Sequence, residues 1–372
     1  MDVAAIVPPY VAKPFQLQPF TAVMLAPGRV GDPASARALA RPYRDVASRL
    51  TSWIDQGRAT ADDAPALYLH EYTVEGLTVR GLVGALDVSR RAADAIDRAV
   101  WPHEAIHPDQ AGELADRMLQ MALNPAPILL VHHGSADLRE VLTVVADGDP
   151  DWTYLDRTGQ RQRIWAVRDP SLLERLDELL GRTTCLIADG HHRYAAYLRL
   201  QQEHPGTDWD AGLAMLVDQD DTPLFLGAIH RTLAGTSLGE LADAADGAGA
   251  EVRHGTRSEA LAVLDSTHLA LTDGYTWVTV APQGLEHRAA VAWLHEDVLP
   301  RLPRPPVRVD HHHSVEEALA VAGPGRPAIL LPSPDFEQVK DLVEAGGLLP
   351  EKATSFQPKP SLGVLMRPVN GG

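Results

Sequence analysis

The order of apolar and polar positions along the chain predicts short strands that alternate with amphipathic helices. Helical spacing of apolar residues occurs over 36–56, 109–123, 171–180, 194–203, 288–298, 314–322 and 336–345. Short apolar or alternating runs typical of strands occur at 66–72, 78–86, 127–132, 160–167, 183–188, 213–218, 224–229, 277–281 and 328–331. This succession predicts an α/β or α+β fold with a mixed sheet.

A change of composition predicts two regions in the chain. With 372 residues the chain is long enough for two domains. From about Gly235 onward, Ala, Gly and acidic residues become more frequent. We therefore expect an N-terminal region at 1–234 that holds the chemistry, and an additional C-terminal α/β region at 235–372 whose tail returns to the site.

One strand-to-helix junction concentrates unusual residues. Residues 185–194 read Cys-Leu-Ile-Ala-Asp-Gly-His-His-Arg-Tyr. The first four of them lie in the strand predicted at 183–188. Asp189 stands where a helix N-cap is expected, and Gly190 allows a tight backbone turn. His191, His192 and Arg193 are then placed in the first turn of the following helix.

Three basic side chains at a helix N-terminus predict an anion among them. The helix dipole is already positive at that end, so cations there are unfavourable unless negative charge is bound. A phosphate or a nucleotide is the simplest such ligand. A shared metal ion on His191 and His192 is disfavoured, because neighbouring helical residues point about 100° apart. We predict that Gly190, His191, His192 and Arg193 bind phosphate.

Two further pairs of residues have the chemistry of a site. His103 and Glu104 follow a proline, and such a pair supplies a general base or holds magnesium. His230 and Arg231 follow the strand predicted at 224–229 and would add positive charge to a phosphate pocket. For Glu104 the alternative is a solvated surface carboxylate. For the pair at 230–231 the alternative is an ordinary strand end.

The C-terminal tail supplies three more candidates. Residues 349–360 are irregular and polar, and they contain Lys352, Thr354 and Lys359. These side chains are candidates for substrate or phosphate contacts. An ordinary exposed tail is the alternative.

Charge and cysteine content exclude several classes of protein. The chain has 33 basic and 50 acidic residues and a net charge of −17, which disfavours binding to DNA, RNA or an anionic membrane. One cysteine, Cys185, excludes an intrachain disulfide and a cysteine-rich zinc site, and we expect it to be a buried thiol. Without a leader-like segment or a long apolar stretch, the cytoplasm is the expected compartment.

Well-known nucleotide and hydrolase motifs are missing from the sequence. It contains no Walker loop, no Gly-x-Gly-x-x-Gly after a strand and no Gly-x-Ser-x-Gly elbow. A P-loop ATPase, a Rossmann dehydrogenase and an α/β-hydrolase are therefore disfavoured.

Separated motifs resemble a bacterial and archaeal family named "domain of unknown function 1015". The landmarks are Ala64-Pro-Ala-Leu-Tyr68, Pro102-His-Glu104, Asp116-Arg117, Ala188-Asp-Gly-His-His-Arg-Tyr194, His230-Arg231 and the tail 349–359. The resemblance spans roughly 43–366. One departure is that Pro8-Pro9-Tyr10 leads into Val-Ala, where the family has Asp-Val.

The junction also resembles the nucleotide-binding core of the ParB/sulfiredoxin-like fold. That fold includes free-serine kinases, CTP-hydrolysing DNA clamps and sulfinic acid reductases. The resemblance implies a mixed sheet with such a core and a phosphate cradle at the helix N-terminus. For an acidic chain, phosphorylation of a small hydroxy amino acid fits best among these activities.

The leading hypothesis is a phosphotransferase that uses ATP, or another nucleoside triphosphate, with Mg²⁺ to phosphorylate a hydroxy amino acid such as serine. Residues 190–193 would neutralise the phosphates. Asp189 would bind the metal or orient the acceptor, and Glu104, carried over from the family motif, would be the general base. The partners would be a nucleotide and a small-molecule substrate, with a homodimer left open.

Two other functions remain open at this point. One is a nucleotide-binding or phosphate-sensing protein without turnover, which the missing Asp-Val after Tyr10 would suit. The other is a metal-dependent hydrolase whose ligands include His103, Glu104 and the pair at 191–192.

Overall fold

The chain divides into two compact units. The computed structural model describes residues 6–40, 46–265, 267–285 and 288–369. Unit 1 consists of Met1–Pro102, Ile106–Leu224 and Pro358–Gly372, and unit 2 consists of His103–Ala105 and Phe225–Gln357. The division predicted at 234/235 falls inside unit 2, because the strand at 230–234 pairs with later strands of that unit. The tail from Pro358 belongs to unit 1.

Unit 1 is organised around a ten-stranded mixed sheet. Its strand order is β1-β7-β12-β9-β13-β6-β5-β11-β10, with β2 paired to β6. The pairs β7–β12 and β9–β13 are parallel, and the other neighbours are antiparallel. The strands of this sheet are β1 (Val11–Ala12), β2 (Leu17–Gln18), β5 (Leu67–Val74), β6 (Leu77–Asp87), β7 (Arg98–Trp101), β9 (Ile128–His132), β10 (Trp152–Leu155), β11 (Arg161–Val167), β12 (Cys185–Asp189) and β13 (Ala211–Asp218).

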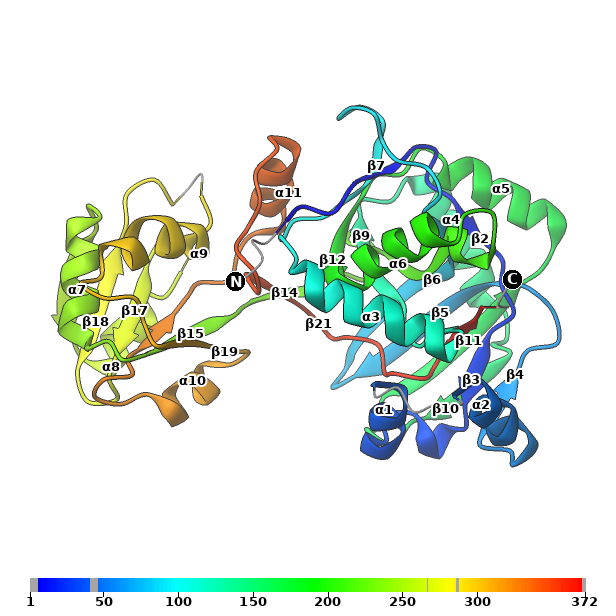
Figure 1. The fold of residues 1–372 in the computed structure, drawn as a ribbon, viewed down its shortest axis with the longest axis horizontal. Coiled ribbons are helices and arrows are strands. Elements are labelled where there is room, and N and C mark those ends of the chain that lie inside the picture. Colours follow the sequence, from blue (N-terminus) through cyan, green and yellow to red (C-terminus); the bar gives the residue numbers. More distant parts are fainter. Residues whose placement is uncertain (1–5, 41–45, 266, 286–287, 370–372) are drawn as a thin grey trace. The chain divides into compact units, whose positions relative to one another are not determined.

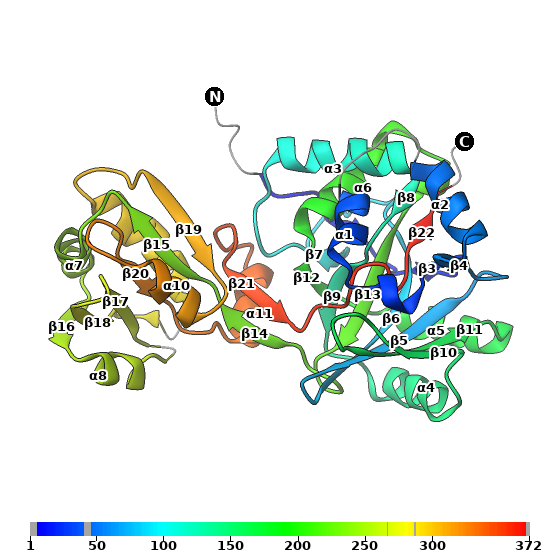
Figure 2. The same ribbon diagram turned by 90° about the horizontal axis from the view of Figure 1, so that it is seen from below.

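Helices cover both faces of this sheet. Figure 2 shows α3 and α6 side by side on one face and α4 on the other. The helices of unit 1 are α1 (Pro33–Ala40), α2 (Val46–Asp55), α3 (Pro108–Met121), α4 (Ala136–Asp147), α5 (Pro170–Leu180) and α6 (His191–Glu203). Two small antiparallel pairs complete the unit: β3 (Val23–Leu25) with β4 (Ala59–Ala61), and β8 (Leu123–Asn124) with β22 (Arg367–Pro368).

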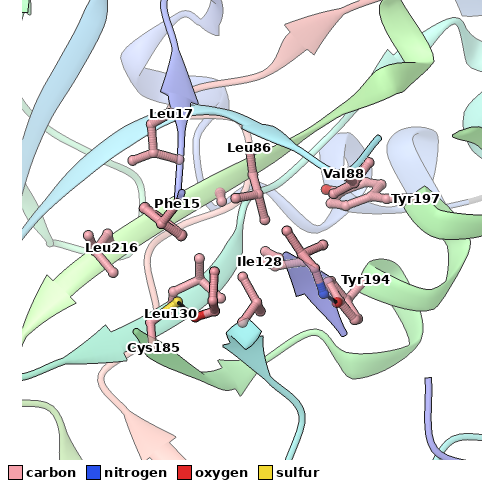
Figure 3. Packing of buried hydrophobic residues seen from close by; sticks show 14 of the residues in the cluster. Phe15, Leu17, Leu86, Val88, Ile128, Leu130, Cys185, Tyr194, Tyr197 and Leu216 are labelled. Carbon is pink, nitrogen blue, oxygen red and sulfur yellow. Dashed lines mark hydrogen bonds between the residues drawn. The ribbon is translucent and has the colours of Figure 1, made fainter. Parts of the chain in front are cut away.

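The core of unit 1 packs the sheet against helices α3, α4, α5 and α6 and includes the predicted buried thiol. Figure 3 shows Cys185 packed close to Leu130. The Cys185 side chain is buried, and burial raises the pKa of its thiol. The hydroxyl of Tyr194 donates to the carbonyl of Pro9 and accepts from the backbone N–H of Val11. The family landmark Tyr194 thus joins helix α6 to the N-terminal segment.

Unit 2 contains an antiparallel six-stranded sheet. The strand order is β16-β18-β17-β20-β15-β19, and β14 and β21 form a separate antiparallel pair (Figure 1). Its strands are β14 (Phe225–Ala228), β15 (His230–Ala234), β16 (Glu251–Gly255), β17 (Leu269–Thr272), β18 (Trp277–Ala281), β19 (Arg308–His312), β20 (Ala328–Leu330) and β21 (Thr354–Gln357). Its helices are α7 (Leu238–Gly247), α8 (Arg257–Ala262), α9 (Ala290–Trp293), α10 (Val315–Val321) and α11 (Phe336–Glu344).

The α/β fold class with a mixed sheet is confirmed, and most predicted elements exist. The helix predicted over 36–56 corresponds to α1 and α2, and residues 41–45 between them lie outside the described residues. The helix predicted over 288–298 is shorter: α9 is followed by a π-helical turn over Leu294–Val298. Among the described helices, none has the length and apolarity needed to cross a bilayer.

The strand predicted over 224–229 is the main exception. The chain forms β14, which pairs with β21, and then β15, which pairs with β19 and β20. His230 and Arg231 therefore open a new strand and are buried, so the alternative of an ordinary strand end in contact with water is wrong. The reason is tertiary pairing, which an apolar run in the sequence does not specify.

Candidate functional site

The strand–turn–helix junction of the sequence forms as expected around a glycine. Gly190 has φ of 98°, in the region that favours glycine, and it stands at the N-cap position of α6. A Cβ at this position would lie 3.0 Å from the Arg193 side chain and from Ile128. The N-cap role predicted for Asp189 is wrong, because Asp189 ends β12 and its carboxylate is bound elsewhere.

The Asp189 carboxylate is held by two cations. Arg193 Nη2 donates to Oδ2 at 2.6 Å, and Lys359 Nζ donates to Oδ1 at 2.5 Å. Burial by itself would raise the pKa of Asp189, but the charges and hydrogen bonds of Arg193 and Lys359 outweigh it and hold that pKa below its ordinary value. Asp189 is therefore an ionised carboxylate at neutral pH.

Arg193 is fixed by the backbone as well. Its Nη1 donates to the carbonyls of Ala126 and Pro127, in the segment that leads into β9. Because the guanidinium has five donors in a rigid plane, these bonds set the direction in which the rest of the group points. Arg193 is a pre-positioned cation at the end of β12.

A cavity of about 340 Å³ in unit 1 opens in front of these three side chains. Its volume lies within the range of small-molecule sites, about 300–1,000 Å³. Three cationic side chains and one carboxylate contribute to its wall, and most of the other lining residues are apolar. The lining residues are Leu39, Leu114, Arg117, Met118, Met121, Pro125, Ala126, Pro127, Leu129, Asp189, Arg193, Lys359, Pro360 and Leu362.

His191 and His192 are placed differently from Arg193. Neither is among the residues that line this cavity. His191 is buried, and Nε2 of His192 accepts a hydrogen bond from the backbone N–H of His107 at 3.2 Å. The rings of His107 and His192 are stacked with centroids 6.5 Å apart. His192 thus joins the start of α6 to the residue that precedes α3.

The other predicted residues belong to unit 2, and three of them, His103, Lys352 and Thr354, lie next to Glu104. The Glu104 carboxylate accepts from the backbone N–H groups of Ala353 at 3.0 Å and of Lys352 and Thr354 at 3.3 Å. The Thr354 hydroxyl donates to it at 3.3 Å and lies 2.7 Å from Nε2 of His103. Burial raises the pKa of Glu104 to about 7, against the lowering effect of the N–H groups of Thr354, Ala353 and Lys352.

His230 and Arg231 are both buried in β15 of the same unit. The backbone N–H of Leu331 donates to Nδ1 of His230 at 3.1 Å. Burial, helped by the charge of Arg231, lowers the pKa of His230 to about 4, so this imidazole is neutral at physiological pH. Arg231 donates to backbone carbonyls of its own unit.

The predicted site residues thus form two groups, one in each unit. Asp189 to Arg193 and Lys359 lie in unit 1, and His103, Glu104, His230, Arg231, Lys352 and Thr354 lie in unit 2. The sequence interpretation missed the apolar lining from α3, including Met118 and Met121. The helical pattern marks these residues as buried but does not say which of them face a cavity. It also left Arg117 without a role, although the Asp116-Arg117 landmark pointed to this residue.

A resident metal centre does not fit the donor set. Asp189 is the only carboxylate among the described residues that line the cavity, and both of its oxygens accept from cations. Across the described ranges, no group of three or more His, Cys, Asp or Glu side chains could hold a metal ion.

The chain belongs to the family described as "Protein of unknown function (DUF1015)". The family matches residues 12–294, which is more than half of the chain. Comparison with curated protein sequences gave no match.

Solved structures provide distant likenesses. C-terminally truncated SbnI from Staphylococcus aureus is 11% identical with a TM-score of 0.43, and the match covers 72% of this chain and 83% of that one. A free serine kinase in complex with AMP is 17% identical with a TM-score of 0.39, over 71% and 88%. A conserved hypothetical protein from Pyrococcus furiosus is 17% identical with a TM-score of 0.36, over 71% and 92%. Likenesses of this size carry no inference about what this chain binds.

Proposed function

We propose that the unit 1 cavity binds a nucleoside triphosphate and that the protein transfers a phosphoryl group to a hydroxy amino acid such as serine. The observation that carries the proposal is the cavity itself, in which an apolar lining meets Arg193 and Lys359. A nucleotide matches these two parts of the cavity, because it has a flat base at one end and phosphates at the other. Charge-assisted hydrogen bonds from arginine and lysine are the usual means of holding phosphate.

Asp189 balances the two cations until a phosphate arrives. An incoming phosphate competes with the Asp189 carboxylate for Arg193 and Lys359. Arg193 stays in place because the carbonyls of Ala126 and Pro127 hold its other donors. The nucleotide would enter as its magnesium complex, so the ion would be part of the substrate and not a metal held by Asp189.

Glu104 is the general base of this proposal. Its carboxylate is largely buried, and its pKa of about 7 suits proton transfer near neutral pH. Turnover should therefore rise with pH as Glu104 ionises around pH 7.

A nucleotide-binding protein without turnover is the second candidate. It is favoured by the state of Asp189, whose two oxygens are already bound to Arg193 and Lys359. In that case the nucleotide would bind in the same cavity, and no ADP would be released with any acceptor.

One pair of measurements separates these candidates. Calorimetry with ADP and ATP measures binding, and a coupled ADP-release assay across a panel of hydroxy amino acids measures turnover. For the kinase we expect Glu104→Gln to retain nucleotide affinity and to lose roughly 100-fold or more of its turnover. Glu140→Gln, at an exposed position of α4, is the matched control and should behave like the unaltered protein.

The outcomes are distinct. Nucleotide affinity with no ADP release for any acceptor would favour the second candidate over the kinase. No nucleotide affinity at millimolar concentration would overturn both.

A further inference from the structure

A buried arginine and the Glu104 carboxylate lie on opposite sides of one backbone turn in unit 2. Arg231 is fully buried in β15, and its Nη1 donates to the carbonyl of Ile229. Its Nη2 donates to the carbonyl of Lys352 at 2.8 Å and to that of Glu351 at 3.4 Å. The guanidinium therefore binds the carbonyl side of the turn at 351–354.

The same peptide groups bind Glu104 through their other ends. The group between Glu351 and Lys352 gives its carbonyl to Arg231 and its N–H to Glu104 Oε2 at 3.3 Å. The next group gives the Lys352 carbonyl to Arg231 and the Ala353 N–H to Glu104 Oε1 at 3.0 Å. Two consecutive peptide dipoles thus point from the cation to the carboxylate.

This arrangement requires an unusual backbone conformation at Lys352. Its φ is 54°, in the left-handed region that non-glycine residues rarely adopt. An αL residue directs successive N–H groups to one side and makes an anion-binding concavity. The conformation costs about 1–2 kcal/mol for a residue with a Cβ. The strain at Lys352 is therefore the cost of aiming both N–H groups at Glu104.

We propose that Arg231 is the positioning residue of Glu104 and acts on it through these two peptide groups. The inference rests on the proposed function only in taking Glu104 as the general base. The guanidinium fixes the turn and polarises its carbonyls, and the N–H ends then hold the carboxylate in place and favour its ionised form. Arg231 is thereby assigned a role other than direct phosphate binding.

Other charged groups near this turn do not replace Arg231. Burial lowers the pKa of His295 and of His311 to about 4, with Arg231 adding to the effect, so both are neutral at pH 7. His103 lies 3.7 Å from Glu104 and contacts the hydroxyl of Thr354. Lys352 contributes its backbone to the turn, and its ammonium adds positive charge near His311. Arg231 is the cation that contacts the peptide groups themselves.

The proposal is tested on nucleotide-free protein by following the ¹³C carboxyl resonance of Glu104 against pH, with Glu104→Gln identifying the signal. In Arg231→Gln, whose neutral side chain ends where the arginine Nε stands and so loses both the charge and the contacts to the turn, we expect the Glu104 titration to move upward by about one pH unit. Arg326→Gln is the matched control, because Arg326 pairs with Asp310 in the same unit and should leave the titration unchanged. Circular dichroism checks that each variant is folded.

An unchanged titration in folded Arg231→Gln would overturn the proposal. If that variant does not fold, Arg231→Lys replaces it, since it keeps the charge but loses the planar fork. We then expect a smaller upward shift, and no shift at all would again overturn the assignment. Because no nucleotide or acceptor is present, the result is independent of whether the kinase proposal holds.

Discussion

The most informative perturbation is Arg193→Gln in the unit 1 cavity. The substitution removes the cation and also its bonds to the carbonyls of Ala126 and Pro127, because the glutamine amide ends at about the position of the arginine Nε. A hydrogen bond to a charged group contributes about 1.5–3 kcal/mol. If Arg193 binds phosphate, the loss corresponds to a roughly 10- to 150-fold higher Kd.

One effect opposes this loss and is smaller. In the free protein Arg193 pairs with Asp189, and a phosphate must weaken that ion pair to bind. The side chains of Arg193 and Asp189 are 21% and 28% exposed, so the pair is partly solvated and worth about 0–1 kcal/mol. The gain from phosphate therefore exceeds the cost, and the variant should bind nucleotide more weakly.

The assay is calorimetry with ADP at fixed ionic strength. Arg199→Gln is the matched control, because Arg199 lies on the same helix, pairs with Glu203 and Asp116, and does not line the cavity. We expect the control to keep the affinity of the unaltered protein within about twofold, since an exposed ion pair contributes little. Equal ADP affinity in folded Arg193→Gln and in the control would refute the phosphate site.

Two further predictions concern stability. Tyr194→Phe removes the buried hydroxyl that bonds the backbone of Pro9 and Val11. Leaving these backbone groups unpaired should lower the free energy of unfolding by about 1–3 kcal/mol, as measured by urea unfolding. The exposed Tyr275→Phe is the control, and an equal effect in the two variants would contradict the prediction. Burial lowers the pKa of His70 to about 4 in the folded state, against hydrogen bonding to Gln162 and the charge of Glu71, which raise it. The unfolded chain therefore binds the proton first, and stability from this residue is lost as pH falls from about 6.5 to 4, by roughly 2 kcal/mol at pH 5. The urea midpoint of His70→Gln should depend less on pH over this interval, and an equal dependence would contradict the assignment.

The sequence by itself determined the local structure of this protein. The apolar run at 183–188, the glycine after Asp189 and the helical pattern at 194–203 specify a strand, a tight turn and a helix, and β12, Gly190 and α6 form accordingly. The burial of Cys185 was equally predictable. These features depend on residues that are close in sequence, so periodicity and backbone preferences suffice to predict them.

Only the tertiary structure decided which chemical groups meet. Lys359 reaches Asp189 from the far end of the chain, and the turn at 352–354 binds Glu104. Arg231 is buried in β15, which pairs with β19 and β20, whereas its sequence position indicated only that it follows a strand. Such pairings depend on sheet register and on contacts between residues far apart in sequence, which no local pattern encodes.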